Sequence, residues 1–215
     1  MRRLSSQDGV EVNPYIALAD NGLSMVMVMT LFTVMVLLAI LQKEDTRKDV
    51  REEFYDRVIQ AFPEQQRPQM LDYKVKNDPP GAQRWVFKGQ VLFVKGTAKL
   101  TPQGKQLLSK FADLMAQNTD KWRRARIEGH TMPTPLNKPD NWDLANLRAS
   151  TVAKLFTDKS CAIRANSIST SGRGGQSKAL GLSRTDQRNE RVEIILEYSA
   201  LSASEKTDDT GGCNR

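Results

Sequence analysis

The N-terminal part of the chain contains an apolar segment without any charge, and this segment restricts the possible folds more than any other feature. Residues 22–41 read GLSMVMVMTLFTVMVLLAIL, and these twenty residues as α-helix would extend for ~30 Å, the thickness of a bilayer's hydrocarbon core. The run is longer than the ~7–15 apolar residues of a signal peptide, no small-x-small cleavage pattern follows, and Lys43 and Glu44 come directly after it. We therefore predict a retained transmembrane helix over residues 14–42, after a short segment 1–13.

One carboxylate, Asp20, lies at the N-terminal end of this helix. A helix-embedded carboxylate costs ~2.5–3.5 kcal/mol on insertion scales, and such residues usually face a partner or an aqueous path. Asp20 is therefore a candidate ion site. It would equally well cap the helix at the membrane interface, since Asp is a good N-cap and Gly22 follows. Ser24 lies one turn later on the same face, where its hydroxyl would bind the protonated acid or help to hold a cation.

Composition limits the other kinds of site. The chain has a net charge of +7, but its densest basic cluster, residues 121–126, is short and typical of a solvated helix end, so we expect no direct nucleic-acid partner. With one His and two Cys, we expect no metal site. Basic residues are more frequent after the apolar segment than before it, and the positive-inside rule taken literally places the C-terminal part in the cytoplasm. That rule is weak for long translocated domains.

The segment that follows the apolar helix has two parts. Residues 43–60 alternate charges of both signs around an apolar stripe, which predicts a stalk helix. Residues 62–81 contain four prolines and little periodicity, which predicts a linker. Stalk and linker together occupy residues 43–83, and the polar tail 199–215 is expected to be flexible.

Residues 84–198 alternate strand and helix signals, which predicts an α/β sandwich. The first strand signal lies around Gly89, which suggests a bulge or turn. A helix follows with Thr101 as N-cap and Pro102 at its first position. The remaining expected elements are a strand over residues 124–129, a helix over 144–159, a strand over 167–171 and a strand over 191–198.

Four patterns in this domain resemble OmpA-like peptidoglycan-binding domains. They are VLFVKGTAKLTPQG, IEGHT, NWDLANLRASTVAKL and QRNERVEIIL, in the order in which the family has them. The N-terminal sequence ALADNGLSMVMVMTLFTVMVLL resembles the single span of MotB-type stator subunits, which include ZorB of the Zorya anti-phage system. The resemblance implies a single N-terminal transmembrane helix plus an α/β sandwich of OmpA-like type.

The resemblance also implies roles for particular residues. Asp20 is similar in position to the carboxylate that translocates ions in the family. Arg148 matches the arginine that grips a carboxylate of diaminopimelate in the peptidoglycan stem peptide, a task that suits a guanidinium fork. Asn141 and Leu144 match positions that shape the pocket, and Thr131 lies in the loop that leaves the strand.

One position departs from the family pattern. The family commonly reads GHTD or GYTD, with the Asp taking the ligand's ammonium, whereas this chain has Met132 there. A thioether cannot pair with a cation, so binding is weaker or Asp140, Asp143 or Glu128 substitutes; Asp140 and Asp143 are the favoured candidates. In the alternative, the domain keeps the fold and has lost tight binding.

The resemblance places the N-terminus in the cytoplasm and the C-terminal domain in the periplasm of a bacterial inner membrane. In the periplasm Cys161 and Cys213 would form a disulfide that stabilises the domain by roughly 4 kcal/mol in the entropic model, or they remain two unpaired thiols. The residues leave both possibilities open.

The function implied is that of the B subunit of an ion-driven, proton-favoured rotary motor. Such a subunit is not an enzyme, needs no cofactor, binds peptidoglycan, and works as a homodimer with an A-type (MotA or ZorA) membrane subunit, about five of them per two copies. The short linker and the missing acid favour a Zorya-type defence motor over a flagellar stator. The alternative is a passive peptidoglycan anchor in which Asp20 only caps the helix.

Overall fold

The structure is a computed structural model that describes residues 14–71, 78–133, 141–159, 163–179 and 181–198. Within the first range, the side chains of residues 14, 16–20 and 43–47 lie outside the description. The chain divides into two compact units, Met1–Asp45 and Thr46–Arg215. The expectations for residues 1–13 and for the tail 199–215 fall outside the described residues.

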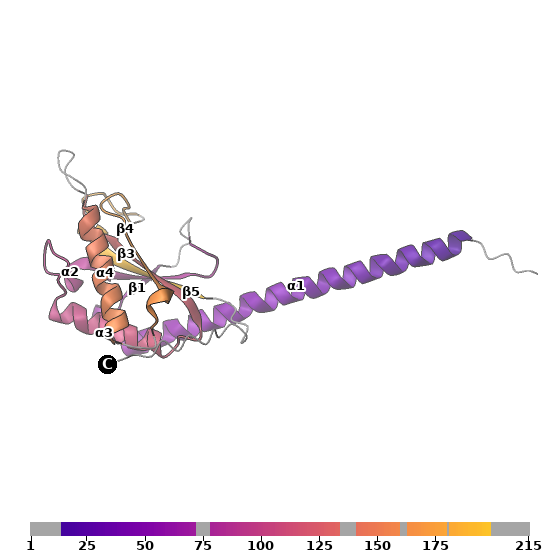
Figure 1. The fold of residues 1–215 in the computed structure, drawn as a ribbon, viewed down its shortest axis with the longest axis horizontal. Helices are drawn as coiled ribbons and strands as arrows, with labels where there is room; N and C mark the ends of the chain where they lie inside the picture. Colours follow the sequence, from indigo (N-terminus) through magenta and orange to yellow (C-terminus); the bar gives the residue numbers. More distant parts are fainter. Residues whose placement is uncertain (1–13, 72–77, 134–140, 160–162, 180, 199–215) are drawn as a thin grey trace, which may run out of the picture. The chain divides into compact units, whose positions relative to one another are not determined.

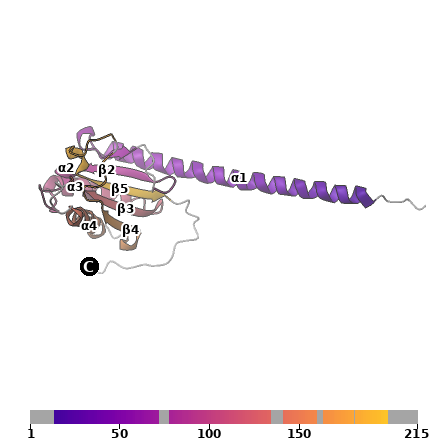
Figure 2. The same ribbon diagram turned by 90° about the horizontal axis from the view of Figure 1, so that it is seen from above.

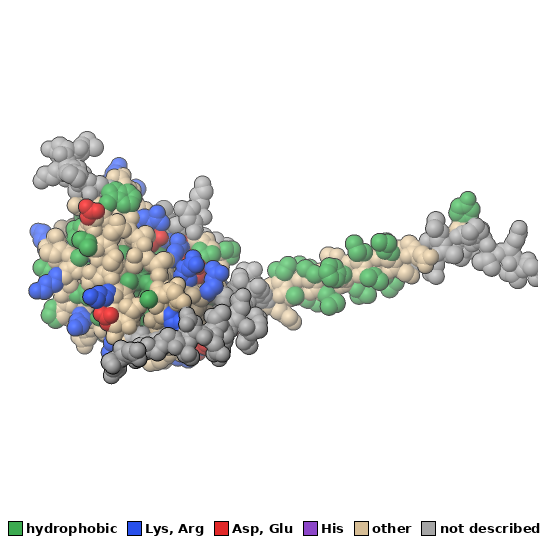
Figure 3. Space-filling view, viewed as in Figure 1, with side chains coloured by type: hydrophobic (Ala, Val, Ile, Leu, Met, Phe, Trp, Pro, Cys, Tyr) green, Lys and Arg blue, Asp and Glu red, His purple; other side chains and the backbone are tan. Residues whose placement is uncertain are grey.

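The first unit contains most of the helix α1, Pro14–Ala61. Its stretch Asn21–Gln42 has 22 residues with a mean hydropathy of 2.6, which is long and apolar enough to cross a membrane by length and composition. Hydrophobic side chains cover this part of the helix in Figure 3. The hydroxyls of Thr30 and Thr33 each donate to a backbone carbonyl of the same helix at 2.8 Å, so they need no outside partner. The prediction of one N-terminal apolar helix is confirmed.

The second unit is built on a five-stranded mixed sheet with the strand order β1-β2-β5-β3-β4 (Figures 1 and 2). β3 and β4 are parallel, and the other neighbouring pairs are antiparallel. The strands are β1 Gln69–Leu71, β2 Gln83–Lys88, β3 Trp122–His130, β4 Ile168–Gly172 and β5 Arg191–Tyr198.

Helices α3 (Pro102–Ala116) and α4 (Trp142–Lys159) pack against each other, and α4 also contacts β3 and β4. α3 begins as predicted, because the Thr101 hydroxyl accepts a hydrogen bond from the Gly104 amide at 2.8 Å and Pro102 occupies the first turn. The shorter helices are α2 Gly89–Leu92 and the 3-10 turns Glu64–Gln66, Ala165–Ser167 and Gln187–Asn189. The expected α/β sandwich is confirmed.

The two faces of the sheet differ in chemistry because side chains alternate along each strand. One face, with Trp85, Ile127 and Ile194, packs against α3 and α4 in a single apolar core. The other face carries charged side chains that are nevertheless buried: Arg84 on β2, Glu128 and His130 on β3, and Arg191, Glu193 and Glu197 on β5.

The structure differs from the expectation that residues 43–83 form only a stalk and a linker. Phe54, Val58 and Phe62 are at most 2% exposed and belong to the core of the domain. The expected linker also contains β1, which pairs with β2. Pro68 directly precedes β1, which is an edge strand of the sheet. Because Pro68 lies outside the paired residues, its missing N–H removes no hydrogen bond between strands.

Gly89 follows the end of β2 and begins α2, so the chain turns at this position and forms no bulge within the strand. Its amide donates to the carbonyl of Glu190 at 2.8 Å, and a Cβ at this position would lie 2.7 Å from that oxygen. The backbone therefore approaches the start of β5 too closely for a side chain, and the chain turns into α2.

Candidate functional site

Arg148 lies in the first half of α4 with only 1% of its side chain exposed. Its Nε donates to the Thr97 carbonyl at 2.9 Å, and its guanidinium carbon lies 5.0 Å from the centroid of the Phe93 ring. Its Nη1 lies 2.6 Å from Oε1 of Glu190. Three contacts from two other parts of the chain therefore hold the guanidinium in one orientation.

Small residues allow α4 to place Arg148 this deeply. Ala145 and Ala149 share its buried face. Gly129 on β3 faces Ala145, and a Cβ on Gly129 would lie 2.1 Å from the Ala145 carbonyl oxygen. The Asn146 side chain also accepts a hydrogen bond from the Gly172 amide at 2.6 Å, which ties α4 to β4. The glycine in IEGHT thus sets how closely the arginine helix approaches the sheet.

Glu190, the ion-pair partner of Arg148, precedes β5 and lines a hollow on the surface of the domain. The hollow has a volume of about 410 Å³. Its lining residues are Lys88, Gln90, Asp186, Gln187, Arg188 and Glu190. Arg148 itself does not line the hollow, but its ion-pair partner does.

The other predicted binding residues lie at the ends of β3 and α4. Thr131 is buried, and its amide donates to the Gly174 carbonyl at 3.0 Å. The Asn141 carbonyl accepts the first hydrogen bond of α4, from Ala145, and Leu144 is half-buried. Asp143 is exposed in the first turn of α4, where a negative charge also favours the helix dipole.

Several predicted site residues lie outside the described residues: Asp140, Cys161 and Cys213, together with the side chain of Asp20. Ser24 is exposed on the apolar part of α1. Met132, which stands where the family commonly has an acid, is half-buried after β3.

Glu128, one of the three alternatives to the family's acid, is not available for a ligand ammonium. Its carboxylate accepts hydrogen bonds from Arg84 at 3.1 Å and from Arg173 at 3.0 Å. Burial alone would raise the pKa of Glu128, but Arg173 and Arg84 together hold this pKa below its ordinary value. Glu128 is therefore an internal ion-pair partner on the charged face of the sheet.

Arg84 is the centre of this buried ion-pair network. Its Nη2 lies 2.7 Å from Asp78, and its Nη1 contacts both Glu128 and Glu193. Burial by itself would lower the pKa of Arg84, but the hydrogen bond to Asp78 and the charge of Glu193 raise it above its ordinary value. Arg191 also pairs with Glu193. The charged groups are thus matched by close partners of opposite charge.

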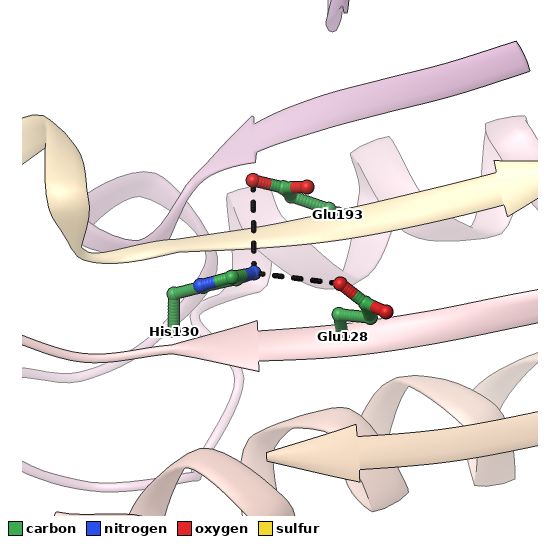
Figure 4. A group of neighbouring side chains, drawn as sticks. All are labelled: Glu128, His130 and Glu193. Carbon is green, nitrogen blue, oxygen red and sulfur yellow. Dashed lines mark ion pairs between the residues drawn. The ribbon is translucent and has the colours of Figure 1, made fainter. Parts of the chain in front are cut away.

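His130 adjoins this network, and Figure 4 shows its Nε2 pointing toward Glu128 and Glu193. The distances from Nε2 are 3.6 Å to Oε1 of Glu193 and 3.9 Å to Oε2 of Glu128. Burial and the charge of Arg191 lower the pKa of His130 to about 4, against the opposing effect of the two carboxylates. His130 is therefore neutral at neutral pH.

The trio of Glu128, His130 and Glu193 has residue types that bind metals, but the four carboxylate oxygens of the two glutamates are already engaged by arginines. Arg84 contacts one oxygen of each glutamate, and Arg173 and Arg191 contact the other two. A metal ion would have to displace these guanidinium groups and lie beside their positive charges. The arrangement fits an internal ion-pair network better than a metal site.

The motif around Arg148 predicts this residue, but the sequence does not indicate the groups that hold it. Thr97 and Glu190 are distant from Arg148 in sequence, and no local pattern links them. The charged sheet face did leave a signal, since RARIEGH and RVEIILEY both alternate charged and apolar residues with the period of a strand.

Comparisons with known proteins agree with this architecture. Residues 92–193 match the model of the OmpA family. No match was found among curated proteins. Among solved structures, a MotB-like protein from Desulfovibrio vulgaris is 19% identical, with 75% of this chain and 96% of that chain covered and a TM-score of 0.58.

Two further solved structures are similar. The cell wall anchor of the T6SS from Pseudomonas aeruginosa is 22% identical, with 68% of this chain and 96% of that chain covered and a TM-score of 0.50. The periplasmic domain of Helicobacter pylori MotB is 18% identical, with 62% and 88% covered and a TM-score of 0.48. At these identities the likeness concerns the fold. The chain therefore combines an N-terminal apolar helix with a domain that matches the OmpA family model over residues 92–193 and is similar in fold to a MotB-like protein.

Proposed function

We propose that the OmpA-like domain binds peptidoglycan and that Arg148 binds a carboxylate of the diaminopimelate in the stem peptide. The observation that supports this most directly is the fixed guanidinium of Arg148, whose ion-pair partner Glu190 lines a surface hollow. A guanidinium held in one orientation suits a directed, charge-assisted contact with a carboxylate. Thr131, Asn141 and Leu144 would shape the surroundings of the ligand. The T6SS wall anchor of similar fold is, by its description, a protein that anchors to the cell wall.

Co-sedimentation of the full-length protein, solubilised in detergent, with purified peptidoglycan tests this proposal. Arg148→Lys keeps the positive charge and removes the fork, and we expect a loss of retention of about tenfold or more. Arg123→Ala is the matched control, because Arg123 is 63% exposed on β3 and should leave retention unchanged. Full retention by a folded Arg148→Lys protein would contradict the proposal.

Asp140 and Asp143 remain sequence-based candidates for binding the ligand's ammonium. Asp140→Ala and Asp143→Ala proteins, tested in the same co-sedimentation assay, separate the two. Unchanged retention of both variants would remove them as candidates.

We further propose that the chain is the B subunit of an inner-membrane, ion-driven motor that is not an enzyme. The N-terminus would lie in the cytoplasm, the OmpA-like domain in the periplasm, and two copies would assemble with about five A-type (MotA or ZorA) subunits. Asp20 would carry protons, assisted by Ser24. An elementary charge that crosses the membrane releases roughly 2.3 kcal/mol per 100 mV, and a carboxylate at a subunit interface can convert this energy into a step between two packings.

Asp20→Asn is the sharpest test of the motor. The variant is assayed for function in cells and for co-purification with the A-type subunit, with Asp45→Asn, just beyond the apolar segment, as the charge-matched control. Assembly with loss of function is expected for Asp20→Asn, and full function is expected for Asp45→Asn. Full function of Asp20→Asn would remove the ion-carrier role and favour a passive wall anchor in which Asp20 caps the helix.

A Zorya-type defence motor is favoured over a flagellar stator. Met132 in place of the family's acid supports this choice, as does the short connection between the apolar helix and the domain, since Phe54 already belongs to the domain core. Gene neighbourhood distinguishes the two. An A-type gene with a long cytoplasmic tail beside helicase or nuclease genes is expected for the defence motor, and a flagellar-type A gene alone would contradict it.

A further inference from the structure

Glu190 lines the hollow and also pairs with the buried guanidinium of Arg148. The side chain of Glu190 is 22% exposed, whereas that of Arg148 is 1% exposed. Glu190 also lines the hollow of about 410 Å³. A ligand in the hollow therefore meets the carboxylate of Glu190, and this carboxylate is in direct contact with the guanidinium of Arg148.

The other carboxylate in the hollow is already engaged. Asp186 lies 2.6 Å from Nη2 of Arg188 and also accepts a hydrogen bond from the Arg188 amide at 2.9 Å. These bonds lower the pKa of Asp186 to about 2. Gln90 and Gln187, which also line the hollow, hydrogen-bond to each other at 2.9 Å. Glu190 differs from Asp186 because its partner is a buried arginine rather than an exposed neighbour in the same turn.

The pair keeps one donor group and one acceptor atom available, side by side. Nε of Arg148 is bonded to Thr97 and Nη1 faces Glu190, whereas Nη2 has no hydrogen-bond partner among the described residues. Of the two oxygens of Glu190, Oε1 contacts Arg148, and Oε2 has no partner in the described part of the chain. A carboxylate would complete the guanidinium, and an ammonium would complete the glutamate.

We infer that Glu190 is the ammonium-binding half of a site for a zwitterionic amino-acid end group, whose carboxylate binds Arg148. In such a group the ammonium and the carboxylate are attached to the same carbon, which matches two opposite charges in direct contact. Glu190 repels a ligand that has a carboxylate alone, and Arg148 repels a ligand that has an ammonium alone. This inference rests on the proposed peptidoglycan binding and assigns to Glu190 the task for which the sequence offered Asp140 and Asp143.

Calorimetry with two small ligands tests the inference on the full-length protein in detergent. The ligands are diaminopimelate and pimelate, which is the same seven-carbon diacid without its ammonium groups. We expect wild-type protein to prefer diaminopimelate by about tenfold or more, as one charge-assisted contact suggests. Glu190→Gln keeps the size of the side chain, and it should bring this ratio close to one by weakening diaminopimelate binding and relieving the repulsion of pimelate.

Asp186→Asn is the matched control, because Asp186 lines the same hollow but is engaged by Arg188. The preference of this variant for diaminopimelate over pimelate should equal that of wild type. Thermal unfolding checks that each variant is folded. If Glu190→Gln is unfolded, Glu190→Asp replaces it, since the shorter side chain withdraws the charge, and a reduced ratio is again expected.

Three results from the variants would overturn the inference alone: a wild-type ratio in a folded Glu190 variant, tighter binding of both ligands by Glu190→Gln, or loss of the preference in Asp143→Asn instead. The second result would make Glu190 an internal competitor for Arg148. A wild-type protein that binds neither diaminopimelate nor peptidoglycan would overturn the proposed function and this inference together. A protein that is retained on peptidoglycan but shows no preference for diaminopimelate over pimelate overturns only the role of Glu190.

Discussion

Replacing Phe54 by alanine would show whether the helical segment before β1 is part of the folded domain. The Phe54 side chain is 2% exposed, and its ring meets Trp85 and Phe111 edge to face at centroid distances of 5.9 and 5.8 Å. Trp85 and Phe111 also contact each other at 5.8 Å, so the three rings form one closed cluster between α1, β2 and α3. Phe54→Ala removes one third of this cluster and leaves a cavity at its centre.

The expected loss follows from burial and ring contacts. Truncating a buried Phe to Ala typically costs about 3–5 kcal/mol, which includes lost transfer free energy and the cavity left behind. Each edge-to-face ring contact contributes about 0.5–1.5 kcal/mol to this loss of stability. Because Phe54 makes two of these contacts, we expect a decrease in the free energy of unfolding of about 4 kcal/mol.

Urea unfolding of the full-length protein in detergent, followed by tryptophan fluorescence, measures this loss, since Trp85 and Trp122 are buried. With a denaturant slope of about 2 kcal/mol per molar urea, the midpoint should fall by about 2 M. Gln60→Ala, on an exposed position of the same helix, should stay within about 0.5 kcal/mol of wild type. A loss below about 1 kcal/mol for Phe54→Ala would refute the conclusion that residues 54–62 complete the core.

Three further changes test other parts of the domain. The pKa of His130 is about 4 in the folded protein and about 6.5 in the unfolded chain, so protonation in acid favours unfolding. The free energy of unfolding should therefore fall by about 2 kcal/mol from pH 7 to pH 5. His130→Gln should remove this contribution from the pH-dependent shift of the urea midpoint. A Cβ at position 129 would lie 2.1 Å from the Ala145 carbonyl oxygen, on the helix that carries Arg148. Gly129→Ala should therefore lower the free energy of unfolding by about 1–3 kcal/mol and reduce retention on peptidoglycan. Retention equal to that of wild type would contradict this. Thr101→Ala should cost about 1–2 kcal/mol by urea unfolding through loss of the bond from the Gly104 amide, and an unchanged midpoint would show that the cap contributes nothing.

The elements with strong local signals were predictable from the sequence. Thr101 and Pro102 mark the start of α3, and the apolar alternation in RVEIILEY marks β5. β1 was missed because it has only three residues, stands beside prolines and depends on pairing with β2. The local sequence predicts Phe54 as part of a stalk, because the rings that bury it come from β2 and α3 and a sequence window does not contain such long-range contacts.

In the candidate site too, residues within a local motif were predictable and residues that depend on long-range contacts were not. Arg148 was predicted from the motif around it, but its contact with Thr97 spans 51 residues of sequence and depends on how α4 lies over the sheet. The sequence allows Glu128 as an acid for the ligand, and this alternative is wrong because Arg84 and Arg173 occupy its carboxylate. Which of several acids is available depends on their partners in space, and residue type alone does not give those partners.

The domain contains two buried arginines whose surroundings indicate different roles. Arg84 contacts three carboxylates, from Asp78, Glu128 and Glu193, and removing one of them would leave buried charge uncompensated at a cost of about 3–5 kcal/mol. Arg148 contacts one carboxylate, and that carboxylate borders a hollow. A fully matched ion-pair cluster has nothing left to offer a ligand, so Arg84 holds the sheet and the segment at Asp78 together. An arginine with one partner at the surface keeps bonding capacity, and this difference in surroundings is the physical reason to place recognition at Arg148 rather than at Arg84.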